Sequence, residues 1–464
     1  MPEAVIVAFL ALPFFRPFVK KLMPLDGLFW LPSISLLILL GIFPAYGFRP
    51  ECLPMLIVAL SINIVNFALR PYDSIHSHSP LLNMFLLVFL SAAAIPMFVF
   101  APKPYSHFNG DTETARTLKI ENSDKDYYLQ IYGTIQTEAD VAKPLIFLVP
   151  PELGSARSVE LVCRELNNKG FTVVTYSRKG YDTPYTNEKG QTRPASPFAL
   201  LRRWRIFRKA TDWYSVNEQG KNLETERRSD IEFLLLHLPA FLGFSRRSDL
   251  PPLLLTGYGA GGSALAYMAG ETGFASRYGK VLGVVAIESR LWSSYLGQDR
   301  QIPEIPPSAG IIQRQLSLFT SHLGNMGPRR VLRTGPLPGN GIPVMYLISG
   351  KALESPRSQK PYEAIFDTMH TSNSRVAALA AVERAGLLDY QDFPFTHPLY
   401  SFFLTGQKGI KKSENPIGNT AALIGNFAVF LLEQAGYTGI TIPPRQDIDG
   451  GLYIESRGLP GFRL

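Results

Sequence analysis

Four long apolar runs stand at the start of the chain, and a different pattern follows them. The runs are Ala4–Phe15, Leu28–Phe48, Leu53–Leu69 and Leu81–Phe100. A helix needs about 20 mainly apolar residues to cross the hydrocarbon of a bilayer. The second and fourth runs meet this length, the third just reaches it, and the first is short. The pattern predicts a transmembrane helical bundle of about four spans over residues 1–102.

Charge density changes at residues 102–104. Residues 1–100 carry only five Lys or Arg and four acidic residues, whereas the rest has the charge density of a soluble protein. Basic loops prefer the cytoplasm, and Lys20, Lys21 and Arg70 follow the first and third runs. Four spans then place residues 103–464 outside the cytoplasm, as the extracytoplasmic domain of a multi-pass membrane protein. If the first run does not span, this orientation no longer follows.

Polar residues within the runs are few. Asn63, Asn66 and Asn83 lie there with no ionisable residue beside them. We expect them to form hydrogen bonds between helices rather than a transport path.

Beyond the proline-rich exit, short apolar runs alternate with helical segments. Two extended segments, Thr114–Ile120 and Tyr127–Ile135, flank a polar turn and predict a hairpin. Continuous apolar runs with helices between them indicate a mainly parallel sheet covered on both faces. The fold class is therefore α/β, with insertions at 182–223 and 290–340. The expected strands are Pro144–Val149, Phe171–Tyr176, Pro252–Thr256, Val281–Ile287, Ile342–Ser349 and Arg375–Val382, and the expected helices are Ser155–Asn168, Asp230–Leu238 and Thr420–Gln434.

The segment Leu253–Met268 places an apolar strand, a glycine-dense corner and an alanine-rich helix in direct succession. Its corner, Gly257-Tyr258-Gly259-Ala260-Gly261, resembles the G-x-S-x-G nucleophile elbow of the α/β-hydrolase superfamily. The resemblance also rests on the corner Arg178-Lys179-Gly180-Tyr181 and on the strand order, and it covers residues 112–436. It implies an α/β-hydrolase-like fold. Gly259 occupies the serine position, so the expected nucleophile is missing.

The resemblance also implies where an oxyanion hole would lie. Its donors would come from Ala260 and from the loop Pro150–Gly154 after the third strand. That loop contains two prolines, which have no N–H group, and Glu152, whose carboxylate would repel a developing negative charge. Ser263 lies one helical turn beyond the corner, where we expect it to pack on the sheet.

A base and an acid are equally hard to find. His397 comes about ten residues later than a catalytic base should, and a lone loop histidine is more often structural. Glu354 and Glu288 are the acid candidates, each following a strand. We therefore predict a degenerate site that binds a ligand without catalysis. Its residues are Glu152, Leu153, Tyr258, Gly259 and Ala260.

Two other interpretations remain open. The first is an active serine-type hydrolase of esters or amides whose nucleophile lies elsewhere. The second is dinucleotide binding, because Gly257, Gly259 and Gly262 satisfy G-x-G-x-x-G between a strand and a helix. Two strand–helix units precede this motif, however, whereas a Rossmann domain normally begins with it. We expect no cofactor otherwise.

Composition limits the remaining classes. The two cysteines, Cys52 and Cys163, cannot form a thiolate metal cluster, and the histidines lack metal-ligand spacing. A net charge of +8 is modest for 464 residues and does not favour nucleic-acid binding. The expected partners are the bilayer and a lipid, an envelope component or a protein. One basic cluster is either a solvated face or a contact for anionic head groups: Arg202, Arg203, Arg205, Arg208 and Lys209.

Overall fold

The computed structural model describes most helices and strands of the chain, with gaps between them. The described residues are 2–15, 18–22, 26–46, 50–69, 80–100, 115–121, 125–134, 143–151, 154–179, 182, 185–193, 218–271, 273–289, 342–349, 377–382, 415–437, 441–448 and 452–457.

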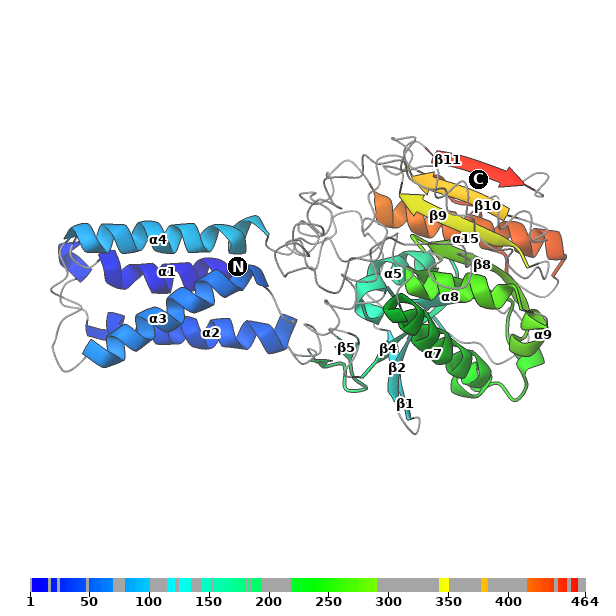
Figure 1. Cartoon of the computed structure of the whole chain (residues 1–464), viewed down its shortest axis with the longest axis horizontal. Helices are drawn as coiled ribbons and strands as arrows, with labels where there is room; N and C mark the ends of the chain where they lie inside the picture. The colour runs from blue at the N-terminus through cyan, green and yellow to red at the C-terminus, as the bar shows by residue number, and fades with distance from the viewer. Residues whose placement is uncertain are drawn as a thin grey trace, which may run out of the picture.

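Four helices form the N-terminal part of the protein (Figure 1). They are α1 (Pro2–Phe15), α2 (Leu31–Tyr46), α3 (Leu53–Leu69) and α4 (Pro80–Val99). Each packs on its neighbour in sequence, and α4 returns to contact α1. Side chains such as Ile6, Leu39 and Leu90 form a small apolar core. Asn63 joins α3 to α2, because its amide donates to the Pro32 carbonyl at 3.1 Å and accepts from Ser33 Oγ at 2.6 Å.

The outer surface of these helices is apolar. Leu81, Leu37 and Phe85 are 75%, 69% and 64% exposed, and among the described residues every exposed large apolar side chain except Ile442 lies between residues 5 and 99. By length and hydropathy, however, the described helix that qualifies as a membrane span is Pro416–Ala435, which is buried inside the protein. The apolar stretches of the N-terminal helices that count by the same measure are shorter, and the one in α4 is Asn83–Val99.

The α/β domain is built on one nine-stranded sheet with the order β1-β2-β4-β3-β7-β8-β9-β10-β11. The strands β4, β3, β7, β8, β9 and β10 are parallel, while β1, β2 and β11 pair antiparallel. The mainly parallel sheet and its leading hairpin are as predicted. The strands are β1 (Arg116–Glu121), β2 (Asp126–Tyr132), β3 (Leu145–Val149), β4 (Thr172–Arg178), β7 (Leu253–Tyr258), β8 (Val281–Ile287), β9 (Val344–Ser349), β10 (Ala377–Val382) and β11 (Leu452–Arg457).

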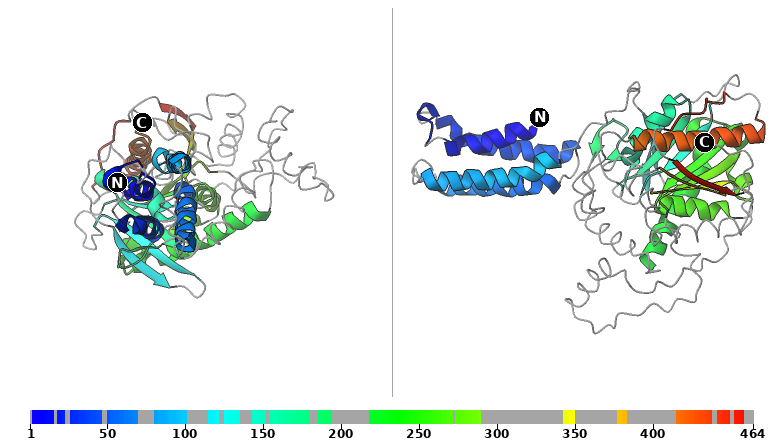
Figure 2. Two further views of the ribbon diagram at one scale, coloured as in Figure 1. Left: turned by 90° about the vertical axis from the view of Figure 1, so that its left-hand side faces the viewer. Right: turned by 90° about the horizontal axis from the view of Figure 1, so that it is seen from above.

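Helices cover both faces of this sheet, and Figure 2 shows α15 and α8 on opposite sides of it. Side chains of a strand alternate between faces, so Phe147 of β3 points into one core while Ile146 and Leu148 point into the other. The first core is closed by α7 (Glu218–Leu242), α8 (Ala260–Ala269) and α9 (Phe274–Tyr278). The second is closed by the short helix η6 (Ala156–Val159), by α5 (Glu160–Asn168) and by α15 (Pro416–Ala435).

Two expected boundaries are corrected. Helix α7 begins at Glu218, inside the expected insertion 182–223, and a small hairpin of β5 (Tyr185–Thr186) and β6 (Thr192–Arg193) precedes it. The start of α7 is charged, which hid its helical pattern. Strand β11 lies beyond residue 436, where the resemblance ended, and was not predicted. The insertion 290–340 lies outside the described residues.

Candidate functional site: a glycine elbow

The elbow is a sharp turn between β7 and α8. Gly259 has φ 52° and ψ −122°, a backbone conformation that is strained for a residue with a Cβ. Its N–H donates to the Ile287 carbonyl of β8 at 2.9 Å, and its own carbonyl accepts the Ser263 N–H at 3.0 Å. The turn is therefore fixed both to the neighbouring strand and to its own helix. Gly259 stands at the tip and is only partly buried.

The other glycines of the corner allow the strand and helix to approach closely. A Cβ on Gly257 would lie 2.6 Å from the Gly262 nitrogen. A Cβ on Gly261 would meet Val149, and one on Gly262 would meet Ser289. Packing thus accounts for Gly257 and Gly262, two of the three glycines of the dinucleotide motif, without a dinucleotide.

Two described hydroxyl groups beside the elbow, those of Ser263 and Ser289, do not stand at its tip. Ser263 is fully buried, and its Oγ donates to the Gly259 carbonyl at 3.2 Å. Ser289 is also fully buried, and its Oγ donates to the Ile287 carbonyl at 3.3 Å. Each hydroxyl serves the local backbone, so neither is placed as a nucleophile.

Three described amides that follow β3 form hydrogen bonds within the protein. Gly154 N–H donates to the Pro151 carbonyl at 3.0 Å, Ala156 N–H donates to Ser177 Oγ at 3.0 Å, and Arg157 N–H donates to Ser155 Oγ at 3.2 Å. An oxyanion hole needs donors aimed at the reacting atom. These three amides are directed elsewhere.

A buried arginine of α7, Arg227, forms a hydrogen bond with the loop after β3. Arg227 of α7 is 5% exposed, and its Nη2 donates to the Pro151 carbonyl and to Asp182 Oδ1, both at 3.1 Å. Burial opposes its charge, but Asp182, Tyr176 and Asp230 together raise the pKa of Arg227 well above its ordinary value. Asp182 Oδ2 in turn accepts the Arg178 N–H at 2.6 Å. The loops after β3 and β4 are thereby joined through one guanidinium.

A second carboxylate completes the network. Asp230 is fully buried and accepts from Tyr127 Oη at 2.8 Å, Lys125 Nζ at 3.0 Å and Arg178 Nη1 at 3.3 Å. Burial, with Asp230 adding to it, raises the pKa of Tyr127, so this phenol remains protonated. Opposite charges pair throughout, which is the arrangement of a structural network rather than of an acid and base poised for proton transfer.

Sequence reasoning missed this network, although α7 carried a signal for it. Arg227, Asp230, Ile231, Leu234 and Leu238 share one helical face, so two charged residues extend an apolar stripe. A charge on the buried face of a helix needs a partner.

Of the predicted site residues, Glu288 does lie beside the elbow. It follows Ile287, whose carbonyl holds Gly259, and its N–H donates to the Leu347 carbonyl at 2.8 Å. Glu288 is 8% exposed and has φ 47°, the only positive φ of a non-glycine residue in the described chain. Strain of this kind is often found at functional sites.

Two predicted pocket residues are instead part of the packing. Tyr258 is 3% exposed and belongs to the core beneath α5 and α15, because alternation along β7 turns it to that face. Ala260 is 1% exposed at the start of α8. The remaining predicted residues lie outside the described part of the chain: Glu152, Leu153, His397, Glu354, Arg202, Arg203, Arg205, Arg208 and Lys209.

A family model named TP_0976_N, described only as an N-terminal domain, matches residues 1–99. No curated protein matches the chain.

Solved structures similar to the chain include esterases and a thioesterase domain. A ferulic acid esterase from Streptomyces cinnamoneus has 12% identity and a TM-score of 0.41, covering 71% of this chain and 93% of that one. Thermogutta terrifontis esterase 2 has 13% identity and a TM-score of 0.33, covering 64% and 96%. A thioesterase domain from the curacin biosynthetic pathway has 13% identity and a TM-score of 0.32, covering 63% and 100%. The parallel sheet, its two helical layers and the elbow together give the domain an α/β-hydrolase-like fold.

Proposed function

We propose that the protein is a membrane-anchored protein whose α/β-hydrolase-like domain binds a ligand and does not hydrolyse it. The observation that carries the proposal is Gly259 at the tip of the elbow, because this position would have to supply the attacking hydroxyl. The internal hydrogen bonds of Ser263, Ser289 and the loop after β3 add to it.

The proposed membrane anchor is the N-terminal helical region. Its exposed apolar side chains would be costly in water and favourable in hydrocarbon. In Figure 1 the arrowheads of β9 and β10 point toward these helices, so the carboxyl edge that carries the elbow lies on their side of the domain. Helix α2 also contacts β6. This arrangement favours a lipid or another component of the membrane surface as the ligand.

A fluorophosphonate probe tests the absence of catalysis. We expect full-length protein in lipid nanodiscs to remain unlabelled, with an active esterase labelled in parallel. The variant Gly259→Ser should also stay unlabelled, because the described loop amides do not face an oxyanion. Labelling of the wild type, with a modified residue identified by peptide mapping, would instead establish the active hydrolase.

Three measurements test the anchor, its orientation and the ligand. The protein should stay with membranes washed in alkaline carbonate, and protease added outside intact cells should cut the α/β domain. Recovery of the protein in the carbonate wash would contradict the membrane anchor. Protection of the α/β domain from the protease would reverse the proposed orientation. Native mass spectrometry should detect retained lipid, whereas a co-purified protein in its place would favour a protein partner.

A further inference from the structure

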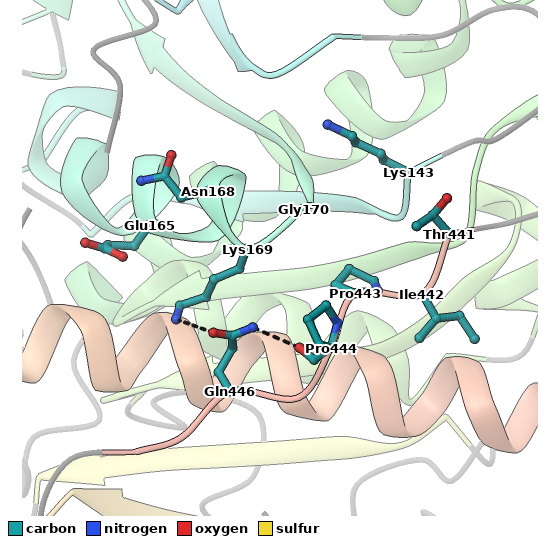
Figure 3. Close-up of a pocket in the computed structure, with 10 residues that line it drawn as sticks. All are labelled: Lys143, Glu165, Asn168, Lys169, Gly170, Thr441, Ile442, Pro443, Pro444 and Gln446. Atoms are coloured by element: carbon teal, nitrogen blue, oxygen red, sulfur yellow. Dashed lines mark hydrogen bonds between the residues drawn. The ribbon is translucent and has the colours of Figure 1, made fainter. Parts of the chain in front are cut away.

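A second site lies at the opposite edge of the sheet from the elbow. A cavity of about 580 Å³ opens between the start of β3, the turn from α5 into β4 and the extended segment 441–446 after α15 (Figure 3). Its residues Lys143 and Gly170 precede parallel strands, which places it at the amino edge. Small-molecule sites typically have volumes of about 300 to 1,000 Å³.

The outer wall of this cavity is held in place by a buried amide. Asn426 of α15 is 2% exposed, and its side-chain amide forms hydrogen bonds with both the N–H and the carbonyl of Gln446. Its Oδ1 accepts the Gln446 N–H at 2.7 Å, and its Nδ2 donates to the Gln446 carbonyl at 2.8 Å. Pro443 packs on Gly170, where a Cβ would approach the proline ring to 3.4 Å. The cavity therefore has a defined shape.

Charge is distributed unevenly around this space. Lys143 and Lys169 supply two ammonium groups, and Lys169 Nζ donates to Gln446 Oε1 at 3.3 Å. Glu165 is the one acidic residue among the described lining residues, and burial raises its pKa against the opposing effect of Lys169. The surroundings of Glu165 thus disfavour negative charge on it. Pro443, Pro444 and Ile442 provide an apolar wall.

We propose that this cavity binds a small ligand with an apolar body and one anionic group, a carboxylate or a phosphate. The anionic group pairs with the ammonium group of Lys143 through a charge-assisted hydrogen bond, because the ammonium group of Lys169 points away from Lys143 toward Gln446 (Figure 3). The body lies against the proline and isoleucine side chains. The site shares no residue with the elbow, so this proposal is tested independently of the proposed function.

Fluorine NMR of full-length protein in nanodiscs tests the site with 4-fluorobenzoate, using empty nanodiscs as the blank. We expect saturable binding, at least about tenfold weaker binding of neutral 4-fluorobenzyl alcohol, and a loss of about tenfold in affinity for Lys143→Gln. The matched control is Lys280→Gln. Lys280 is an exposed lysine that precedes β8 at the same edge but does not line the cavity, and its replacement should leave binding unchanged. Comparing 4-fluorobenzoate with 4-fluorobenzyl phosphate identifies which anionic group is preferred.

A steric variant provides an independent check. Thr441 is an exposed lining residue, so Thr441→Trp should fill the cavity without altering the core and should abolish binding. The proposal is overturned if the benzoate does not bind, if the alcohol binds as tightly, or if binding survives both Thr441→Trp and Lys143→Gln in folded protein.

Discussion

Helices α4 and α15 are both 20 residues long and mainly apolar, yet their surroundings are opposite. Every residue of α15 from Pro416 to Leu432 is buried in the α/β domain. On α4, by contrast, Leu81, Phe85 and Val88 are 75%, 64% and 63% exposed. The buried helix α15 is nevertheless long and apolar enough to cross a membrane. Apolarity alone therefore does not identify a membrane helix. The deciding observation is whether other parts of the protein cover its apolar side chains.

The contrast extends to the two regions that contain these helices. The α/β domain turns its large apolar side chains inward on both faces of the sheet, and it stabilises buried charges by pairing them. The N-terminal helices bury a narrow core and expose apolar residues outward. An exposed apolar surface of this kind marks a contact with a membrane or another protein, and we propose that it contacts the bilayer.

The largest expected effect compares one phenylalanine from each region. Phe427 of α15 is fully buried, whereas Phe89 of α4 is 56% exposed. Phe427→Ala should lower the free energy of unfolding by about 4 kcal/mol, because it leaves a cavity. Phe89→Ala should leave it nearly unchanged. Hydrogen exchange of the core strands, measured by mass spectrometry in nanodiscs, gives the change in the free energy of unfolding for both variants. Similar losses for the two variants would mean that Phe89 is packed against protein.

The next comparison replaces a buried polar group in each region. Asp230→Ala removes the shared acceptor of Tyr127, Lys125 and Arg178, and should cost about 3 kcal/mol. Asn63→Ala removes uncharged hydrogen bonds between α2 and α3, and should cost about 0.6 to 2 kcal/mol. Urea denaturation of the two variants checks the order. A larger cost for Asn63 would show that the helical core depends on its polar contacts more than on packing.

Glycine to alanine changes should have opposite signs in the two regions. Gly257→Ala should destabilise the domain by about 2 kcal/mol, because the new Cβ would meet backbone atoms of α8. Gly41 of α2 has open space around it, so Gly41→Ala should stabilise the helix by up to about 1 kcal/mol. Thermal unfolding followed by circular dichroism gives the sign of the stability change for each variant. A stable Gly257→Ala protein would mean that the elbow can open.

The smallest expected effect is a pH dependence confined to the domain. Burial raises the pKa of Glu165 above its ordinary 4.5, so its contribution to stability is present below the unfolded pKa and is lost as pH rises through the folded pKa. Glu165 is only half-buried, so the change should be well under about 1 kcal/mol. Glu165→Gln should flatten the profile between pH 4 and pH 7 in urea titrations. An unchanged profile would assign the pH dependence to other groups.

Regular patterns made much of the fold predictable. The leading hairpin, the parallel strands and α15 follow from alternation, from continuous apolar runs and from helical periodicity. Strand β11 was missed because it pairs only with β10 and follows α15 after a polar stretch. The start of α7 was missed because charged residues there are satisfied by β4 and the loop after β3, which are distant in sequence.

The candidate site was predicted in part. The position of the elbow and its missing side chain were visible in the glycine spacing, whereas the hydrogen bond of the buried Ser263 to the Gly259 carbonyl was not predicted. The role of Tyr258 was not visible, because a strand that is apolar on both faces gives no sign of which face a residue occupies. The Arg227 contacts with Pro151 and Asp182 also could not be read from spacing alone.

By itself, the sequence determined the order of apolar and polar segments, the strand–glycine–helix corner and the absence of a hydroxyl at Gly259. These are local properties, set by residues within a few positions of one another. Only the tertiary structure decided that α15 is buried while α4 is exposed, that Asp230 accepts hydrogen bonds from three partners, and that a cavity opens beside Lys143. Each of these depends on which distant segments pack together, because burial and charge pairing are set by neighbours in space.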